Sequence, residues 1–203
     1  DVLTDMVFHS TYPQNEIEKE VEVIIDEIQS YKDSPAELIF DEFEEMIFNG
    51  HALGRNILGK AERLRTFTTA DALAFTGRCY RPSNATFFLY GNIDFKRAVR
   101  MLEKATSDLS PLPAEITAEP LPEYVPAERI VKKDTHQAHV LIGTRGLSAN
   151  DERRTPLFLL NNILGGPSMN SRLNIALREK NGLVYTVDSF SVSYTDTGLW
   201  GIY

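Results

Sequence analysis

Cysteine is almost missing from this sequence, which has Cys79 alone among its 203 residues. One cysteine excludes an internal disulfide and a zinc site built from thiolates. It also fits a reducing compartment, so we expect a cytoplasmic location, with the periplasm as the alternative. No apolar run reaches the roughly 20 residues of a membrane-spanning helix, and the first residues lack the basic region and apolar core of a signal peptide.

Basic residues are also in deficit, with 21 lysines and arginines against 29 acidic residues. The resulting net charge of −8 argues against nucleic acid as a partner, because phosphate binding needs a basic surface. The chain begins with Asp1 rather than methionine and ends in the apolar run DTGLWGIY. We therefore expect it to be a segment of a longer protein.

Proline marks the expected domain boundary, because five of the ten prolines fall in SPLPAEITAEPLPEYVP. Such composition is typical of an extended linker, and it divides the sequence into residues 1–107, a linker at 108–127, and residues 128–203. Both outer parts mix helical and strand patterns. This indicates an α+β fold of two related sandwich-like units, each with a largely antiparallel sheet flanked by helices, the first unit being incomplete.

Periodicity and turn residues predict the individual elements. Helices are expected at residues 14–32, 35–48, 69–80, 92–106, 150–166 and 170–180. Strands are expected at residues 85–91, 129–134, 138–146, 183–196 and 198–203.

The first predicted helix carries a line of carboxylates. At about 100° per residue, Glu20 and Glu27 project within roughly 20° of each other, and Glu16 falls near the same line. This line flanks the apolar stripe of Ile17, Val21, Ile24 and Ile28. Carboxylates at the edge of a buried face are costly unless something positive meets them, and a metal ion would do so. The competing interpretation is a solvated helix edge.

The four histidines do not complete a metal site by their spacing. His136 and His139 are three apart in THQAHVLI, where a strand would point them to opposite faces. His9 and His51 have no ligand partner at a useful spacing, and we interpret His51 as structural. Zinc needs three or four ligands, so the residues alone predict no complete site.

Several separate motifs resemble one family in the right order along nearly the whole chain. They are EIEKEVEVIIDEI, DSPAELIFDEFEEMIFNGHALGRNILGKAERLRTFTTADALAF, YRPSNATFFLYGNID and NNILGGPSMNSRLNIALREKNGLVYTVDSF. Together they look like the pitrilysin/insulinase zinc metallopeptidases, which include the mitochondrial processing peptidase type and its bacterial relatives. The resemblance implies that residues 1–107 are the C-terminal part of the catalytic domain and residues 128–203 the start of its partner domain.

The resemblance also implies roles for four residues. Glu27 matches the family's third zinc ligand. Glu20 matches an acidic residue that does not bind the zinc itself but supports the residues that do. Arg178 and Tyr185 match a pair that binds the substrate backbone and stabilises the tetrahedral intermediate. Without the resemblance, a helix-end contact for Arg178 and strand packing for Tyr185 are the simpler interpretations.

One departure limits what this chain can do by itself. The family's H-x-x-E-H motif, which carries two zinc histidines and the general base, is absent from the sequence; the resemblance implies a position upstream of Asp1. We therefore expect weak zinc binding and no activity from this chain alone. The intact parent would be a zinc metalloendopeptidase acting on peptides or unfolded polypeptides, and by family analogy a homo- or heterodimer. The alternative is a non-catalytic structural or peptide-binding subunit of the same family.

Overall fold

The computed structural model of the chain describes residues 2–109, 112–113 and 118–203. Helices and a small antiparallel sheet confirm the α+β class. The chain forms two compact units: unit 1 contains Asp1–Ile28 and Leu58–Ala118, and unit 2 contains Gln29–Ile57 and Glu119–Tyr203. The division of the sequence at a linker of residues 108–127 stays a prediction. Residues 110–111 and 114–117 of that linker lie outside the described residues.

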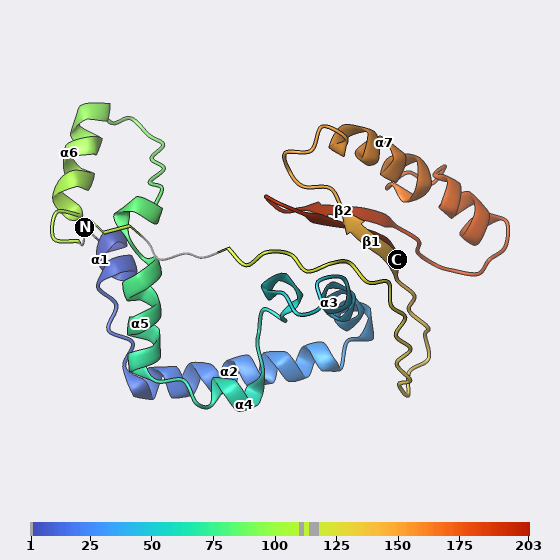
Figure 1. Cartoon of the computed structure of the whole chain (residues 1–203), viewed down its shortest axis with the longest axis horizontal. Coiled ribbons are helices and arrows are strands. Elements are labelled where there is room, and N and C mark those ends of the chain that lie inside the picture. Colours follow the sequence, from blue (N-terminus) through green and yellow to red (C-terminus); the bar gives the residue numbers. More distant parts are fainter. Residues whose placement is uncertain (1, 110–111, 114–117) are drawn as a thin grey trace. The chain divides into compact units, whose positions relative to one another are not determined.

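Unit 1 is helical in its described residues (Figure 1). Local signals fix the helix starts: Thr68 Oγ1 accepts the N–H of Asp71 at 3.3 Å, and Asp71 Oδ2 accepts the N–H of Thr68 at 2.9 Å. Asp94 likewise accepts the N–H of Arg97 at 2.8 Å. The helices are α1 (Val2–Phe8), α2 (Gln14–Lys32, in this unit as far as Ile28), α4 (Ala61–Leu64), α5 (Thr69–Cys79) and α6 (Phe95–Ala105).

The strand predicted at residues 85–91 is not formed. These residues have no regular secondary structure, and the side chains of Phe88 and Tyr90 are 88% and 93% exposed. A strand needs a hydrogen-bonded neighbour to be stable, and the described part of unit 1 offers none.

Unit 2 is built around a three-stranded antiparallel sheet with the order β1-β3-β2. The strands are β1 (Ile142–Gly146), β2 (Ser189–Ser193) and β3 (Gly198–Ile202), all shorter than predicted. Figure 1 shows α3 (Pro35–Ile47) on one face of this sheet and α7 (Arg154–Gly165) on the other. Residues 129–134, also predicted as a strand, join no sheet.

An apolar cluster holds α3 to its face of the sheet. Phe43, Ile47 and Phe48 bury against Leu199 of β3, which is 1% exposed. Gly143 on β1 makes this approach possible, because a Cβ there would lie 2.6 Å from the Phe43 ring. Burial of such side chains provides the main stabilisation of this layer, at about 1.5–3 kcal/mol each.

Hydrogen bonds to Asn161 hold α7 to the opposite face. The buried Asn161 donates through Nδ2 to the carbonyl of Ser189 at 2.9 Å and accepts from Trp200 Nε1 at 3.0 Å. Ser189 Oγ donates to the carbonyl of Asn161 at 2.7 Å. A Cβ on Gly165 would lie 2.7 Å from the backbone nitrogen of Ser189, so this contact also requires glycine. The apolar side chains of Phe158, Leu159, Leu160 and Ile163 remain 46–65% exposed.

Glu44 is the carboxyl group on α3 with an altered proton affinity. Partial burial, followed by the nearby charge of Asp41, raises the pKa of Glu44 above its usual value. Burial, and then Glu44 itself, raises the pKa of the Tyr194 phenol. The folded state therefore binds a proton at Glu44 more tightly than the unfolded chain does.

Replacing Leu199 by alanine tests the central position of the apolar cluster. We expect L199A to lower the free energy of unfolding by about 2–5 kcal/mol, because it removes buried methyl groups and leaves a cavity. Urea denaturation followed by circular dichroism measures the change. L159A, at a position 61% exposed on α7, is the matched control and should change stability by less than about 0.5 kcal/mol. Equal effects of the two variants would contradict this packing.

Replacing Glu44 by glutamine tests the burial of its carboxyl group. A raised pKa in the folded state lowers wild-type stability as pH rises from the usual Glu value of about 4.3 through the higher folded value. We expect E44Q to be more stable than wild type at pH 7, by less than about 1 kcal/mol for a half-exposed group, and equally stable near pH 4. A difference that is independent of pH would contradict the prediction.

Candidate functional site

Helix α2 presents the predicted carboxylates as the sequence indicates. Val21 is buried, and the other members of its stripe, Ile17, Ile24 and Ile28, are half-buried. Glu20 and Glu27 are exposed on the flank of that stripe, and within the described residues neither side chain has a hydrogen bond or an ion pair. Glu16, in contrast, pairs with Lys19 at 2.8 Å. Two carboxylates without a partner are therefore available on one side of α2.

The donor set in this chain does not by itself fit a zinc ion. Structural and catalytic zinc sites use three or four protein ligands. Among the described residues, no group of three or more histidine, cysteine, aspartate or glutamate side chains is close enough to hold a metal. Glu27 can supply one oxygen, so the remaining ligands of any zinc site would have to come from elsewhere.

Three of the four histidines have hydrogen-bond or ion-pair partners, and the structural interpretation of His51 is confirmed. His51 is 8% exposed; its Nδ1 accepts the N–H of Leu53 at 3.2 Å, and its Nε2 bonds the carbonyl of Glu119 at 3.0 Å. His139 Nδ1 lies 2.7 Å from the hydroxyl of Tyr203, whereas His136 is exposed. His9 lies between two carboxylates of unit 1, Asp5 at 3.1 Å and Asp108 at 3.2 Å.

Arg178 and Tyr185 lie on either side of a tight turn in unit 2. Arg178 belongs to the π-helix Asn174–Glu179, and its carbonyl accepts the N–H of Gly182 at 3.0 Å. Gly182 adopts a φ of 58°, which favours glycine. Arg178 has a weak contact with Glu179 at 3.8 Å, and Tyr185 is 90% exposed. Both side chains are thus accessible as hydrogen-bond donors.

The four predicted site residues fall into two pairs on different units. Glu20 and Glu27 belong to unit 1, whereas Arg178 and Tyr185 belong to unit 2. Glu20 and Glu27 share α2, whereas Arg178 in the π-helix and Tyr185 beyond it are separated by the turn at Gly182. A single site that combines all four stays a prediction.

Arg145 is a structurally important cation that the sequence interpretation missed. Its guanidinium donates to the carbonyls of Ile47 at 3.3 Å and Pro122 at 2.6 Å. It also lies 5.7 Å from the ring centroids of Phe48 and Tyr124, a cation–π arrangement. The sequence pattern that could have indicated this role is strand alternation, which places Arg145 on the same face of its strand as Gly143.

Comparison with known proteins identifies the family. Residues 66–203 match a family model described as the peptidase M16 inactive domain.

In the described part of the chain, no helix combines the length and apolarity that a membrane crossing needs.

Relatives match along the entire chain. It is 37% identical over 203 residues to a Bacillus subtilis protein named uncharacterized zinc protease YmxG, covering 49% of that protein. It is 29% identical to a probable mitochondrial-processing peptidase subunit beta of Schizosaccharomyces pombe, covering 47% of it. The chain thus spans about half the length of these relatives.

A solved structure shows the same fold. The crystal structure of a peptidase M16 inactive domain from Pseudomonas fluorescens superimposes with a TM-score of 0.88 at 23% identity, covering 98% of this chain and 48% of that one. The family model covers more than half of the chain, in agreement with the resemblance of its motifs to the pitrilysin/insulinase-type peptidases. The chain belongs to the M16 peptidase family.

Proposed function

We propose that the full-length protein is a zinc metalloendopeptidase that cleaves peptides or unfolded polypeptides, and that residues 1–203 are inactive alone. The observation that carries the proposal is the exposed, unpaired Glu20–Glu27 pair on α2, in a chain whose relatives along its whole length include proteins named zinc proteases. A solvated helix edge would leave the same side chains free, so variants of the full-length protein are needed to distinguish a metal-binding role from a solvated edge.

Glu27 would supply one carboxylate ligand, and Glu20, two helical turns earlier, would orient a neighbouring ligand. Residues of this second kind typically change metal affinity or activity by 10- to 100-fold. The remaining ligands and the general base would come from outside this chain, because its described residues hold no metal-binding group of three. The chain alone is therefore expected to retain little zinc.

Arg178 and Tyr185 would bind the substrate from the partner domain. A guanidinium carries a fixed positive charge and several donors, and a phenol donates one hydrogen bond. Both suit an oxygen that gains negative charge in the transition state. The exposure of Tyr185 and the weak ion pair of Arg178 leave these donors free for that role.

The second candidate function is a non-catalytic subunit of the same family. The description of the model that matches residues 66–203 as an inactive domain favours it, whereas the name subunit beta of one relative supports only assembly with another subunit. Such a subunit would pair with a related chain and bind polypeptide without cleaving it. Its binding would persist after removal of metal, whereas hydrolysis by the proposed enzyme would stop with a chelator and return with zinc.

Replacing Glu27 by glutamine in the full-length protein tests the metal role. We expect E27Q to lose bound zinc and hydrolysis of an unfolded polypeptide, and E20Q to lose about 10- to 100-fold in zinc affinity or activity. Atomic absorption after dialysis and a casein-cleavage assay measure the two effects.

Glu18 provides the matched control, because it lies about 180° around α2 from Glu27 and is also exposed. E18Q should retain zinc and activity. The metal role of Glu27 is wrong if E27Q keeps stoichiometric zinc. Stoichiometric zinc on the 203-residue chain alone would instead contradict the prediction that its site is incomplete.

Replacing Arg178 and Tyr185 in the full-length protein tests the proposed donors separately from the metal. We expect R178K and Y185F to lower kcat by about 100- to 1000-fold, the typical cost of one oxyanion donor, with zinc content unchanged. The matched control is Y31F, which removes the hydroxyl of a partly exposed tyrosine on α2. Loss of zinc in R178K or Y185F, or unchanged kcat in both, would contradict the assignment.

A further inference from the structure

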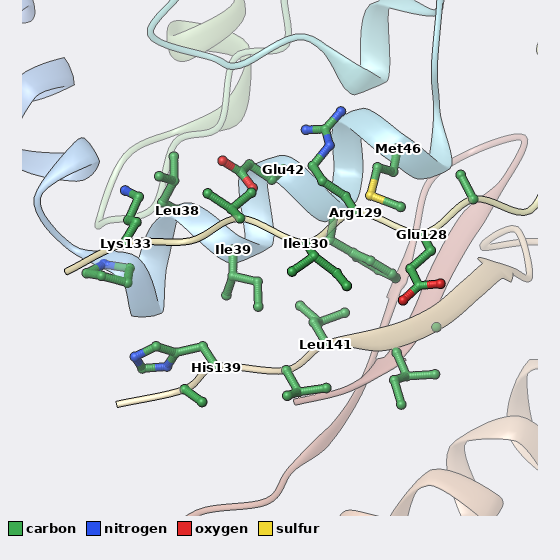
Figure 2. Close-up of a pocket in the computed structure, with 18 of the residues that line it drawn as sticks. Leu38, Ile39, Glu42, Met46, Glu128, Arg129, Ile130, Lys133, His139 and Leu141 are labelled. Atoms are coloured by element: carbon green, nitrogen blue, oxygen red, sulfur yellow. The ribbon is translucent and has the colours of Figure 1, made fainter. Parts of the chain in front are cut away.

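Unit 2 contains a groove that the proposed chemistry does not use. Its volume is about 1100 Å³, and it lies between α3 and two segments without regular secondary structure, residues 124–133 and 135–141, the second leading into β1. Figure 2 shows Ile39 of α3 together with Ile130 and Leu141 from the two segments converging on this space. These three side chains form an apolar part of the lining, and charged side chains, among them Glu42, Glu128, Lys132 and Lys133, line other parts.

The two segments that line the groove are not paired with each other. Among the described residues, no backbone hydrogen bond joins residues 125–132 to residues 137–141. β1 is also an edge strand, because the sheet order β1-β3-β2 leaves its outer side free. Free N–H and C=O groups beside apolar side chains are the elements that bind an added strand. Proteins usually cover such edges, since an open edge promotes aggregation.

The two ends of the groove differ in charge. Figure 2 shows Lys133 near one end and Glu128 near the other. Lys132 and His136 also line the groove, close in sequence to Lys133. Arg129 is already paired with Glu45 at 2.7 Å. This polarity favours one direction for a bound strand with an acidic residue at one end and a basic residue at the other.

We infer that the groove binds one β-strand of about seven residues, contributed by the part of the full-length polypeptide that lies outside residues 1–203. At about 3.3 Å per residue, seven residues span about the same length as residues 127–133 of the first segment, or as residues 137–141 of the second with the first two residues of β1. The relatives supply the argument for the source: they match all of this chain, yet it covers only 47–49% of their length. The strand would alternate apolar residues, facing Ile39, Ile130 and Leu141, with polar ones.

Hydrogen–deuterium exchange tests this inference by comparing the 203-residue chain with the full-length protein. We expect the amides of residues 128–133 and 138–141 to exchange freely in the 203-residue chain and about 100-fold more slowly in the full-length protein. I130D in the full-length protein should restore fast exchange at these amides. The amides of β3 should stay protected in that variant, which shows that unit 2 remains folded.

The control variant L159D carries the same change at an exposed position on α7, and should leave the groove amides protected. Three outcomes would overturn the inference. The groove amides could exchange rapidly in the full-length protein. Protection could appear in the 203-residue chain only as a dimer forms with rising concentration, in which case a second copy is the occupant. Protection could also require added unfolded casein, in which case a substrate is the occupant. None of these results bears on the zinc and hydrolysis assays of the proposed function.

Discussion

The buried amide of Asn161 determines where α7 lies, and the segment that follows α7 depends on it. Three hydrogen bonds join Asn161 to Ser189 on β2 and Trp200 on β3. An unsatisfied buried amide costs about 1–3 kcal/mol, so these partners specify one register of helix on sheet. The chain then continues from Gly165 to the π-helix and turn that carry Arg178 and Tyr185. Asn161 thus fixes the helix from which the chain continues to the proposed substrate-binding pair.

The two faces of the sheet in unit 2 are held by different interactions. On the α3 side, aromatic and aliphatic side chains bury Leu199, and the guanidinium of Arg145 joins Ile47 and Pro122. On the α7 side, a polar and glycine-containing helix face meets the strands. The apolar layer supplies most of the stability, whereas the hydrogen bonds of the polar layer determine where α7 lies on the sheet. This division leaves the apolar side of α7 exposed.

Sequence reasoning succeeded where the signal was local. The helix at Gln14–Lys32 and the helix ends near Pro35 and Thr69 follow from apolar spacing, proline and capping residues within a few positions. The strands predicted at 85–91 and 129–134 are not formed because a strand needs a second strand to pair with, and the described residues provide none for either segment. His51 is buried and hydrogen-bonded, as its structural interpretation predicted, whereas the metal role of Glu27 stays a prediction. Arg145 and Asn161 were missed because tertiary contacts alone define their roles.

The uncovered aromatic residues of 85–90 affect how the chain behaves in solution. This stretch has high β-propensity and contains no charged residue, which are properties of segments that assemble into cross-β aggregates. The net charge of −8 opposes such assembly through mutual repulsion between molecules. Salt screens that repulsion beyond about 10 Å at 0.1 M. The colloidal stability of the chain is therefore electrostatic in origin, and it weakens as ionic strength rises.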